Sequence, residues 1–193
     1  NNMSGPLSYE DPATHDALAL RGEELAARIG SRDGVKLFRK IRGAYRFTRG
    51  DLAGALALVG DYDADDIGIL QRLELASTAR QVLTCLGRLE ERDRASAVWD
   101  ELIVQVSNPE FHGVQHQDLG LIALFEGRPD DAVRSGREFL RAGIHPFEAW
   151  DIIGRGALRA GDATLAREAL EGVQREPVRG RLADAQRRLL AAG

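Results

Sequence analysis

Apolar residues recur at steps of three and four positions between Asp33 and Thr48, which is the period of an amphipathic α-helix. The apolar positions are Val35, Leu37, Phe38, Ile41, Ala44, Tyr45 and Phe47. The intervening positions carry most of the charge, on Lys36, Arg39, Lys40, Arg42 and Arg46. The pattern therefore predicts a helix with one face turned to a core and the other to water.

The same period, bounded by Gly, Pro and Asp, predicts further helices along the chain. Asp11 is the expected N-cap of the first, with Pro12 in its first turn and Gly30 as its stop. Gly50 ends the helix described above, and Asp51 is expected to cap the next. The other predicted helices cover residues 13–29, 52–59, 67–90, 94–106, 111–126, 130–142, 146–160, 163–174 and 178–192.

A short phrase of small and acidic residues repeats in the chain, as RGDLAGA at 49–55, EGRPDDA at 126–132 and AGDATLA at 160–166. The glycines of the last two copies, Gly127 and Gly161, lie 34 residues apart, which is the length of one helix–turn–helix repeat. Aligned alanines at Ala55, Ala97, Ala132 and Ala166 predict four helical hairpins. The second hairpin is the irregular one, with a predicted break at 91–93.

Over residues 33–174 the chain resembles the tetratricopeptide repeat family. The residues that fit are Trp150, Ile153, Gly154, Ala166 and Leu170 in the fourth hairpin, and Leu119, Gly120, Ala132 and Phe139 in the third. The first hairpin fits only at Gly43, Gly50 and Ala55, and Cys85 replaces the small glycine expected in the second. The resemblance implies an all-α solenoid of about four antiparallel hairpins in a right-handed superhelix, with a flanking helix at each end.

We expect residues 11–193 to form one such domain, because 193 residues suffice for a single stacked array. Residues 1–10 are expected to lie outside it, either disordered or a remnant ahead of a native start at Met3. The final helix would cap the array with a polar outer face, which carries Arg179, Arg181, Asp184, Arg187 and Arg188.

The resemblance also implies a function, since such arrays hold a peptide or helix of another protein in the groove lined by each hairpin's first helix. The groove positions would be Lys40, Phe47 and Thr48, then Val82, Leu89 and Glu90, then Gln117, Leu124 and Phe125, and finally Asp151, Arg155 and Arg159. A clamp for a C-terminal carboxylate is not expected, because the only asparagines, Asn1, Asn2 and Asn108, lie outside the groove helices. A homodimer is a further possible assembly.

Composition and charge limit the classes of partner and the cellular location that we expect. A net charge of −4, with no run of Lys or Arg, argues against nucleic acid as a partner. No stretch of about 18 apolar residues predicts a membrane span. A single cysteine, Cys85, cannot form an intrachain disulfide, and with no secretion signal the expected location is the cytoplasm.

No motif predicts catalysis or a cofactor. His112 and His116 have the spacing of two metal ligands, but Gly113 stands where a metalloprotease helix has Glu. Asp61, Asp63 and Asp65 imitate a calcium loop that Asp66 and Arg72 then break, so we expect these carboxylates to favour the start of the next helix instead. Trp99 and Trp150 are expected to pack within hairpins, with Trp150 in the core.

Two functions therefore remain open from the sequence. The first is a non-enzymatic protein-interaction module. The alternative is a sensory domain that binds a small ligand within a larger bacterial signalling or transcription regulator. A helical hydrolase without a visible motif is a third and weaker reading.

Overall fold

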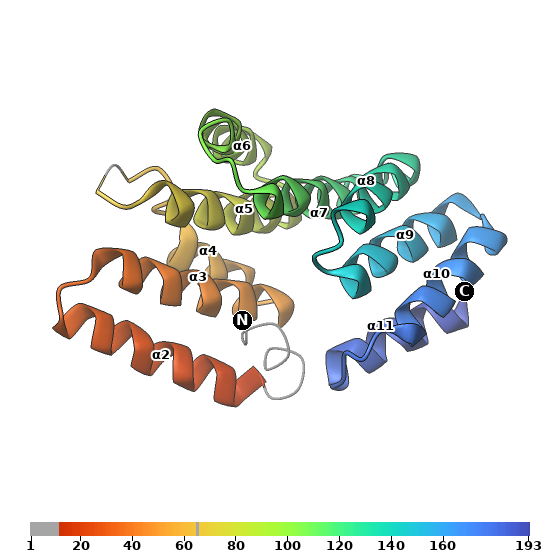
Figure 1. The fold of residues 1–193 in the computed structure, drawn as a ribbon, viewed down its shortest axis with the longest axis horizontal. Coiled ribbons are helices and arrows are strands. Elements are labelled where there is room, and N and C mark those ends of the chain that lie inside the picture. The colour runs from red at the N-terminus through yellow and green to blue at the C-terminus, as the bar shows by residue number, and fades with distance from the viewer. Residues whose placement is uncertain (1–11, 65) are drawn as a thin grey trace. The chain divides into compact units, whose positions relative to one another are not determined.

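The structure is all-α in the part of the chain that it describes (Figure 1). The computed structural model describes residues 12–64 and 66–193, and these ranges contain helices and no strand. Asp11, the expected first N-cap, and the expected N-terminal extension lie outside them. The predicted all-helical class is confirmed. No helix among the described residues combines the length and the apolar character needed to cross a membrane.

Contacts between Cα atoms divide the chain into two compact units, Asn1–Val106 and Ser107–Gly193. Each unit is described by itself, so the expectation that residues 11–193 form one array stays a prediction. The helices of unit 1 are α2 (Pro12–Arg28), α3 (Arg32–Thr48), α4 (Leu52–Val59), α5 (Ile69–Cys85) and α6 (Leu89–Ile103). Those of unit 2 are α7 (Pro109–Phe125), α8 (Pro129–Ala142), α9 (Pro146–Ala160), α10 (Ala163–Arg175) and α11 (Arg181–Ala192).

Within each unit, helices that follow one another in the chain pack side by side as antiparallel neighbours. Three further contacts skip one helix: α3 with α5, α7 with α9, and α9 with α11, which also packs on α10. The predicted bounds 52–59 and 146–160 agree with α4 and α9, and the remaining predicted bounds within unit 2 differ by a few residues. Sequential pairing of this kind is what the hairpin pattern predicts.

The hairpin turns are built on glycines with positive φ, a backbone region that side chains disfavour. Gly50, Gly127 and Gly161 have φ values of 79°, 70° and 74°. The residue after the glycine then caps the next helix in two cases. Asp51 accepts a hydrogen bond from the Gly54 amide at 2.9 Å, and Asp162 accepts one from Leu165 at 3.0 Å. The repeated phrase in the sequence is therefore the signature of a turn and a cap.

The predicted break in the second hairpin is wrong. The turn lies at Gly87, with φ of 69°, and not at 91–93; α5 ends at Cys85 and α6 begins at Leu89. Seven positions before the turn glycine, the other hairpins carry Gly43, Gly120 and Gly154, and the second carries Arg80. Arg80, and not Cys85, thus replaces the small residue.

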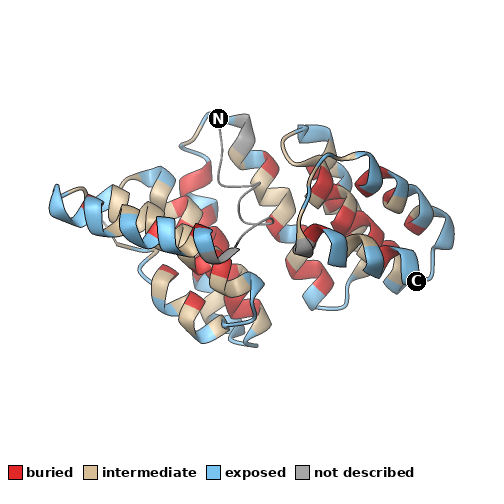
Figure 2. Ribbon diagram, turned by 90° about the horizontal axis from the view of Figure 1, so that it is seen from below, coloured by how far each residue is buried: buried red, intermediate tan, exposed pale blue. Residues whose placement is uncertain are grey.

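Close helix contacts in unit 2 explain why small residues occupy those positions. A Cβ added to Gly120 would lie 2.8 Å from Ile152, and one added to Gly154 would lie 2.7 Å from Leu190. Buried residues gather where the helices face one another (Figure 2), in a core of Ala123, Leu124, Ala132, Phe139, Ala149 and Ile152. Glycine and alanine therefore set the spacing of the helices, and the larger apolar side chains fill it.

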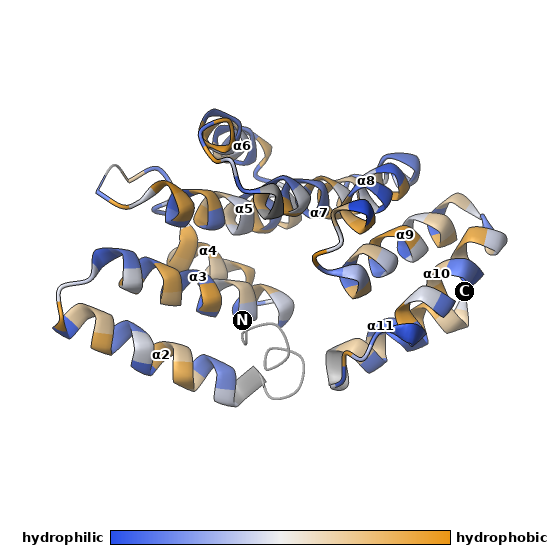
Figure 3. Cartoon of the chain, viewed as in Figure 1, coloured by the Kyte–Doolittle hydropathy of each residue, from blue (hydrophilic) through white to orange (hydrophobic). Residues whose placement is uncertain are grey.

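In unit 1, α4 is apolar along most of its length (Figure 3), which suits a short helix in contact with both α3 and α5. Val59 at its end is fully buried in a cluster with Leu75, Leu83 and Ala95. A Cβ added to Gly43 of α3 would lie 2.5 Å from Val59. The first hairpin thus repeats, with its own residues, the close approach seen in unit 2.

Three further expectations are corrected. Trp99 is fully buried, whereas Trp150, the expected core residue, is only half-buried against Gly172. Arg187 does not belong to a polar outer face, because it lies over the Phe147 ring and donates to the carbonyl oxygens of Glu176 and Val178. The final helix begins at Arg181 and not at 178.

Candidate functional site

The predicted groove residues of unit 2 divide into exposed and buried sets. Phe125, at the end of α7, is 44% exposed, and Arg159, near the end of α9, is also exposed. Gln117 and Arg155 are half-buried. We call these four residues, Gln117, Phe125, Arg155 and Arg159, the α7–α9 face.

A hydrogen bond joins the two helices of the α7–α9 face near their C-terminal ends. Arg159 donates from Nη1 to the carbonyl oxygen of Leu124, the residue before Phe125. The same carbonyl, in the last turn of α7, also accepts a hydrogen bond from the Gly127 amide at 3.3 Å, so Arg159 is its second donor. The guanidinium is thereby held at the backbone of the residue that precedes Phe125, an exposed aromatic residue of unit 2.

Two residues expected to face the groove are buried in unit 2. Leu124 is 1% exposed and belongs to the core, and Asp151 is 3% exposed. Asp151 Oδ2 accepts hydrogen bonds from Arg155 Nη1 at 3.3 Å and from Gln186 Nε2 of α11 at 3.2 Å. Asp151 therefore joins α9 to α11 and is not available to a partner, which corrects its assignment to the groove.

The surroundings of the Asp151 carboxyl change its pKa. Burial raises its pKa above the ordinary value, and Arg155 and Gln186 oppose that change only in part. Its Oδ1 and the Oε1 of Gln186 are both buried acceptors without a hydrogen-bond donor. A proton on the carboxyl would remove the buried charge and turn one of its oxygens into a hydrogen-bond donor.

The predicted groove residues of unit 1 are mostly engaged in local contacts. Lys40 pairs with Glu74 of α5, with 3.6 Å between Nζ and Oε1. Thr48 is exposed and donates from its hydroxyl to the carbonyl of Tyr45, within its own helix, and Phe47 is half-buried. From the second hairpin, Val82 is fully buried, while Leu89 and Glu90 are exposed at the start of α6.

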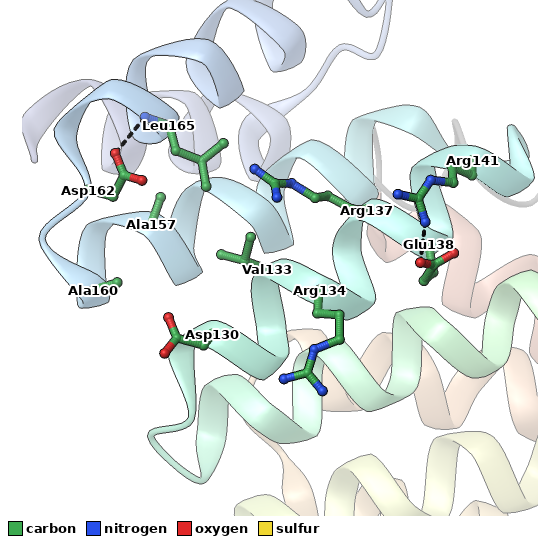
Figure 4. Close-up of a pocket in the computed structure, with 10 residues that line it drawn as sticks. All are labelled: Asp130, Val133, Arg134, Arg137, Glu138, Arg141, Ala157, Ala160, Asp162 and Leu165. Atoms are coloured by element: carbon green, nitrogen blue, oxygen red, sulfur yellow. Dashed lines mark hydrogen bonds and ion pairs between the residues drawn. The ribbon is translucent and has the colours of Figure 1, made fainter.

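A hollow of about 440 Å³ lies on the side of unit 2 formed by the second helices, α8 and α10 (Figure 4). We call it the α8–α10 hollow. It is lined by Asp130, Val133, Arg134, Arg137, Glu138, Arg141, Ala157, Ala160, Asp162 and Leu165. The sequence analysis did not select it, because the resemblance directed attention to the first helices.

The α8–α10 hollow has apolar residues between two charged ends (Figure 4). Val133 and Leu165 supply accessible apolar surface, Asp130 and Asp162 lie at one end, and the arginines of α8 lie toward the other. The signal that could have revealed it is the spacing of Asp130, Val133 and Arg137, which places all three on one stripe of α8.

The residues considered for metal binding do not assemble into a site. Within residues 12–64 and 66–193, no three His, Cys, Asp or Glu side chains come together as a metal ion would require. Asp61 pairs with Lys36 at 2.5 Å, Asp63 with Arg72 at 3.1 Å and Asp66 with Arg32 at 2.6 Å. Asp65 and the side chain of Glu110, which stands near His112, lie outside the described residues.

The role expected for the acidic turn is also corrected. No acidic residue lies in the first turn of α5, whose N-cap is Gly68. The Gly68 amide donates to Asp33 of α3 at 2.9 Å, and the cations that meet Asp61 and Asp66 come from α3 as well. The turn therefore fastens the loop to α3 and does not serve the dipole of α5.

Comparisons with protein-family models, with curated proteins and with solved structures find no match to this chain. Its function is therefore inferred from its own residues.

Proposed function

We propose that this chain is a non-enzymatic interaction module of the tetratricopeptide-like kind, and that a peptide or helix of another protein binds to the α7–α9 face. The single observation that carries the proposal is the pair formed by Phe125 and Arg159. Phe125 is exposed and Arg159 is fixed by a hydrogen bond to the residue before it, and aromatic residues and arginine are both enriched at protein interfaces. The ring supplies apolar area, and the cation orients the partner.

The half-buried members of the face extend this surface. Gln117 lies two turns before Phe125 on α7, and Arg155 lies one turn before Arg159 on α9. Because these residues lie on two packed helices, they are held more rigidly than loop residues would be. Such a face suits an amphipathic segment whose apolar residues cover Phe125 and whose acidic residues approach Arg159.

The alternative is a sensory domain that binds a small ligand, and one observation favours it. The volume of the α8–α10 hollow, about 440 Å³, falls in the range of small-molecule sites. Against it, such sites are mostly apolar, whereas this hollow is lined by six charged side chains. We therefore place it second.

Native mass spectrometry of the chain, purified gently from its source cells, tests the proposal. The expected result is an added polypeptide mass, with hydrogen exchange slowed on the α7–α9 face. An added mass of a few hundred daltons, the range of small metabolites, would support the sensory alternative instead. Exchange slowed only elsewhere on the chain would overturn the assignment to the α7–α9 face.

A further inference from the structure

Two charged side chains in the α8–α10 hollow have no partner. Asp130 and Arg137 line the hollow, and neither side chain makes a hydrogen bond or an ion pair with any described residue. Both are exposed. They are therefore the two charges of the hollow that are free to meet a ligand.

The other charged side chains of the hollow are already engaged. Arg134 pairs with Asp131 at 2.5 Å, and Arg141 pairs with Glu138. The hydrogen bond from Arg141 holds the pKa of Glu138 below its usual value, so Glu138 is ionised and paired with Arg141 at neutral pH. Asp162 uses one oxygen to cap α10. The hollow thus offers one positive group on Arg137 and, at the other end, the carboxylate of Asp130 together with the second oxygen of Asp162.

Helix geometry fixes how far apart the two free charged residues are attached to α8. Asp130 and Arg137 lie seven residues apart on α8, which corresponds to about 10 Å along the helix axis and nearly the same face. Val133 lies between them on that stripe, and Leu165 continues the apolar surface from α10.

We propose that the α8–α10 hollow binds a polyproline II segment in which a basic and an acidic side chain lie three residues apart. Such a helix has three residues per turn and rises about 3.1 Å per residue, so residues three apart share one face at about 9 Å. This separation matches the separation of Asp130 and Arg137. The two prolines between the charges keep the segment in this conformation, and they project from its other two edges, one of which can lie on Val133 and Leu165.

This occupant fits better than an α-helix or a β-strand. A hollow of about 440 Å³ is too small for an α-helix of about 10 Å diameter to enter. In a β-strand, residues on one face lie about 7 or about 13 Å apart, and neither spacing matches the separation of about 10 Å along α8. A polyproline II segment also loses little conformational entropy when it binds.

Synthetic peptides built around Lys-Pro-Pro-Glu and Glu-Pro-Pro-Lys test the proposal by fluorescence anisotropy with the full chain. Either direction of the peptide satisfies the two charges, so at least one of the two is expected to bind. The matched control Lys-Pro-Glu-Pro has the same composition with a spacing of two, and we expect about tenfold weaker binding, the loss of one charge-assisted hydrogen bond.

Charge exchange in the protein supplies the decisive test. Arg137→Asp leaves two acidic groups, so the preferred peptide should become Lys-Pro-Pro-Lys. Asp130→Lys leaves two basic groups, so it should become Glu-Pro-Pro-Glu. Both substitutions are at exposed positions, and unchanged circular dichroism melting confirms folding. A wild-type chain that binds none of these peptides, or variants that keep the wild-type preference, would overturn the proposal.

The hollow and the α7–α9 face can be tested separately. Phe125→Ala should leave peptide binding at the hollow unchanged, while Arg137→Asp should leave binding at the α7–α9 face unchanged. If the peptides fail and partner binding at Phe125 persists, only the inference about the hollow is lost. If a small metabolite displaces the peptides from the hollow at micromolar concentration, the hollow is a ligand site and the peptide assignment is wrong.

Discussion

The guanidinium carbon of Arg80 lies 4.5 Å from the ring centre of Trp99, and both side chains are buried, at 2% and 0% exposure. Arg80 occupies the position where the other hairpins have glycine, and Trp99 lies where the third hairpin has Phe139. A stacked pair therefore lies between α5 and α6, at the position where the other hairpins have a glycine packed closely against a neighbouring helix. The second hairpin is irregular because a large buried arginine on a tryptophan replaces the glycine that the other hairpins use for packing.

Arg80→Ala should lower the free energy of unfolding by about 2–4 kcal/mol. It removes the cation above the indole ring and leaves a cavity that α5 and α6 cannot close. Urea denaturation, followed by circular dichroism, measures the change. Arg80→Met is the matched control, since it keeps length and volume but not charge. A loss with Met close to that with Ala assigns the stabilisation to the charge, and a loss near zero with Ala would contradict the packing described here.

The register of the second hairpin shows what the sequence could and could not predict. The turns at Gly50, Gly127 and Gly161 were predictable, because each glycine ends a helix with an apolar stripe and precedes a capping or polar residue. Gly87 was missed, because α5 and α6 form a nearly continuous helical pattern and Arg80 disguises the repeat. A buried arginine looks like a surface residue in a sequence, and only its contacts reveal where it lies.

The candidate site was less predictable than the fold. Asp151 and Arg155 were expected on the same surface, but α11 covers the first of them, and the sequence does not show which helix α11 packs against. The α8–α10 hollow was missed because it depends on how closely α8 and α10 approach. Periodicity predicts which face of a helix is buried, whereas a hollow depends on the space between helices.

Gly154→Leu should cost about 2 kcal/mol or more of unfolding free energy. A Cβ at this position already lies 2.7 Å from Leu190 and 3.1 Å from Ala169, so the longer side chain would force α9 away from α10 and α11. Ala163→Leu, at an exposed position of α10, is the control for added apolar bulk. Thermal and urea unfolding of both variants check the prediction. A loss below about 0.5 kcal/mol for Gly154→Leu would show that α9 does not pack as described.

Asp151→Asn should stabilise the chain at neutral pH by about 1 kcal/mol. The amide keeps the shape of the side chain, can donate to the unpaired Gln186 Oε1, and removes the need to bury a charge. Arg155, whose side chain is 24% exposed, can be solvated once its partner is neutral. Urea denaturation of the two proteins at pH 7 measures the difference.

The pH dependence of that difference has a definite sign. The pKa of Asp151 is raised above 3.8 in the folded state. The folded chain therefore binds this proton more tightly than the unfolded chain does. The stability that this proton supplies is fully present below pH 3.8 and is lost as the pH rises through the raised folded value. The free energy of unfolding of the wild type should therefore fall progressively below that of Asp151→Asn as the pH increases from about 4. A difference that does not change across this range would rule out a raised pKa.

Reversal of the two arginines of the α7–α9 face should have unequal effects on stability. Arg155→Glu places a second carboxylate beside the buried Asp151, so we expect a marked loss of thermal stability. Arg159→Glu loses only a hydrogen bond to the Leu124 carbonyl at an exposed position, and about 1 kcal/mol is the expected cost. Differential scanning calorimetry compares them. Equal losses would mean that Asp151 and Arg155 are not coupled.

Phe125→Ala should abolish partner binding at the α7–α9 face while it changes the free energy of unfolding by less than about 0.5 kcal/mol. The matched control is Leu119→Ala on the same helix. Leu119 is 42% exposed against 44% for Phe125, but six residues separate them, so they lie on different sides of α7. Once native mass spectrometry has identified the partner, isothermal titration calorimetry with both variants measures the effect. The two substitutions remove similar exposed apolar surface. If the partner binds through non-specific hydrophobic association, both should weaken binding equally, whereas binding at a specific site is weakened only by Phe125→Ala. Equal weakening by both would remove the α7–α9 face from the proposed function.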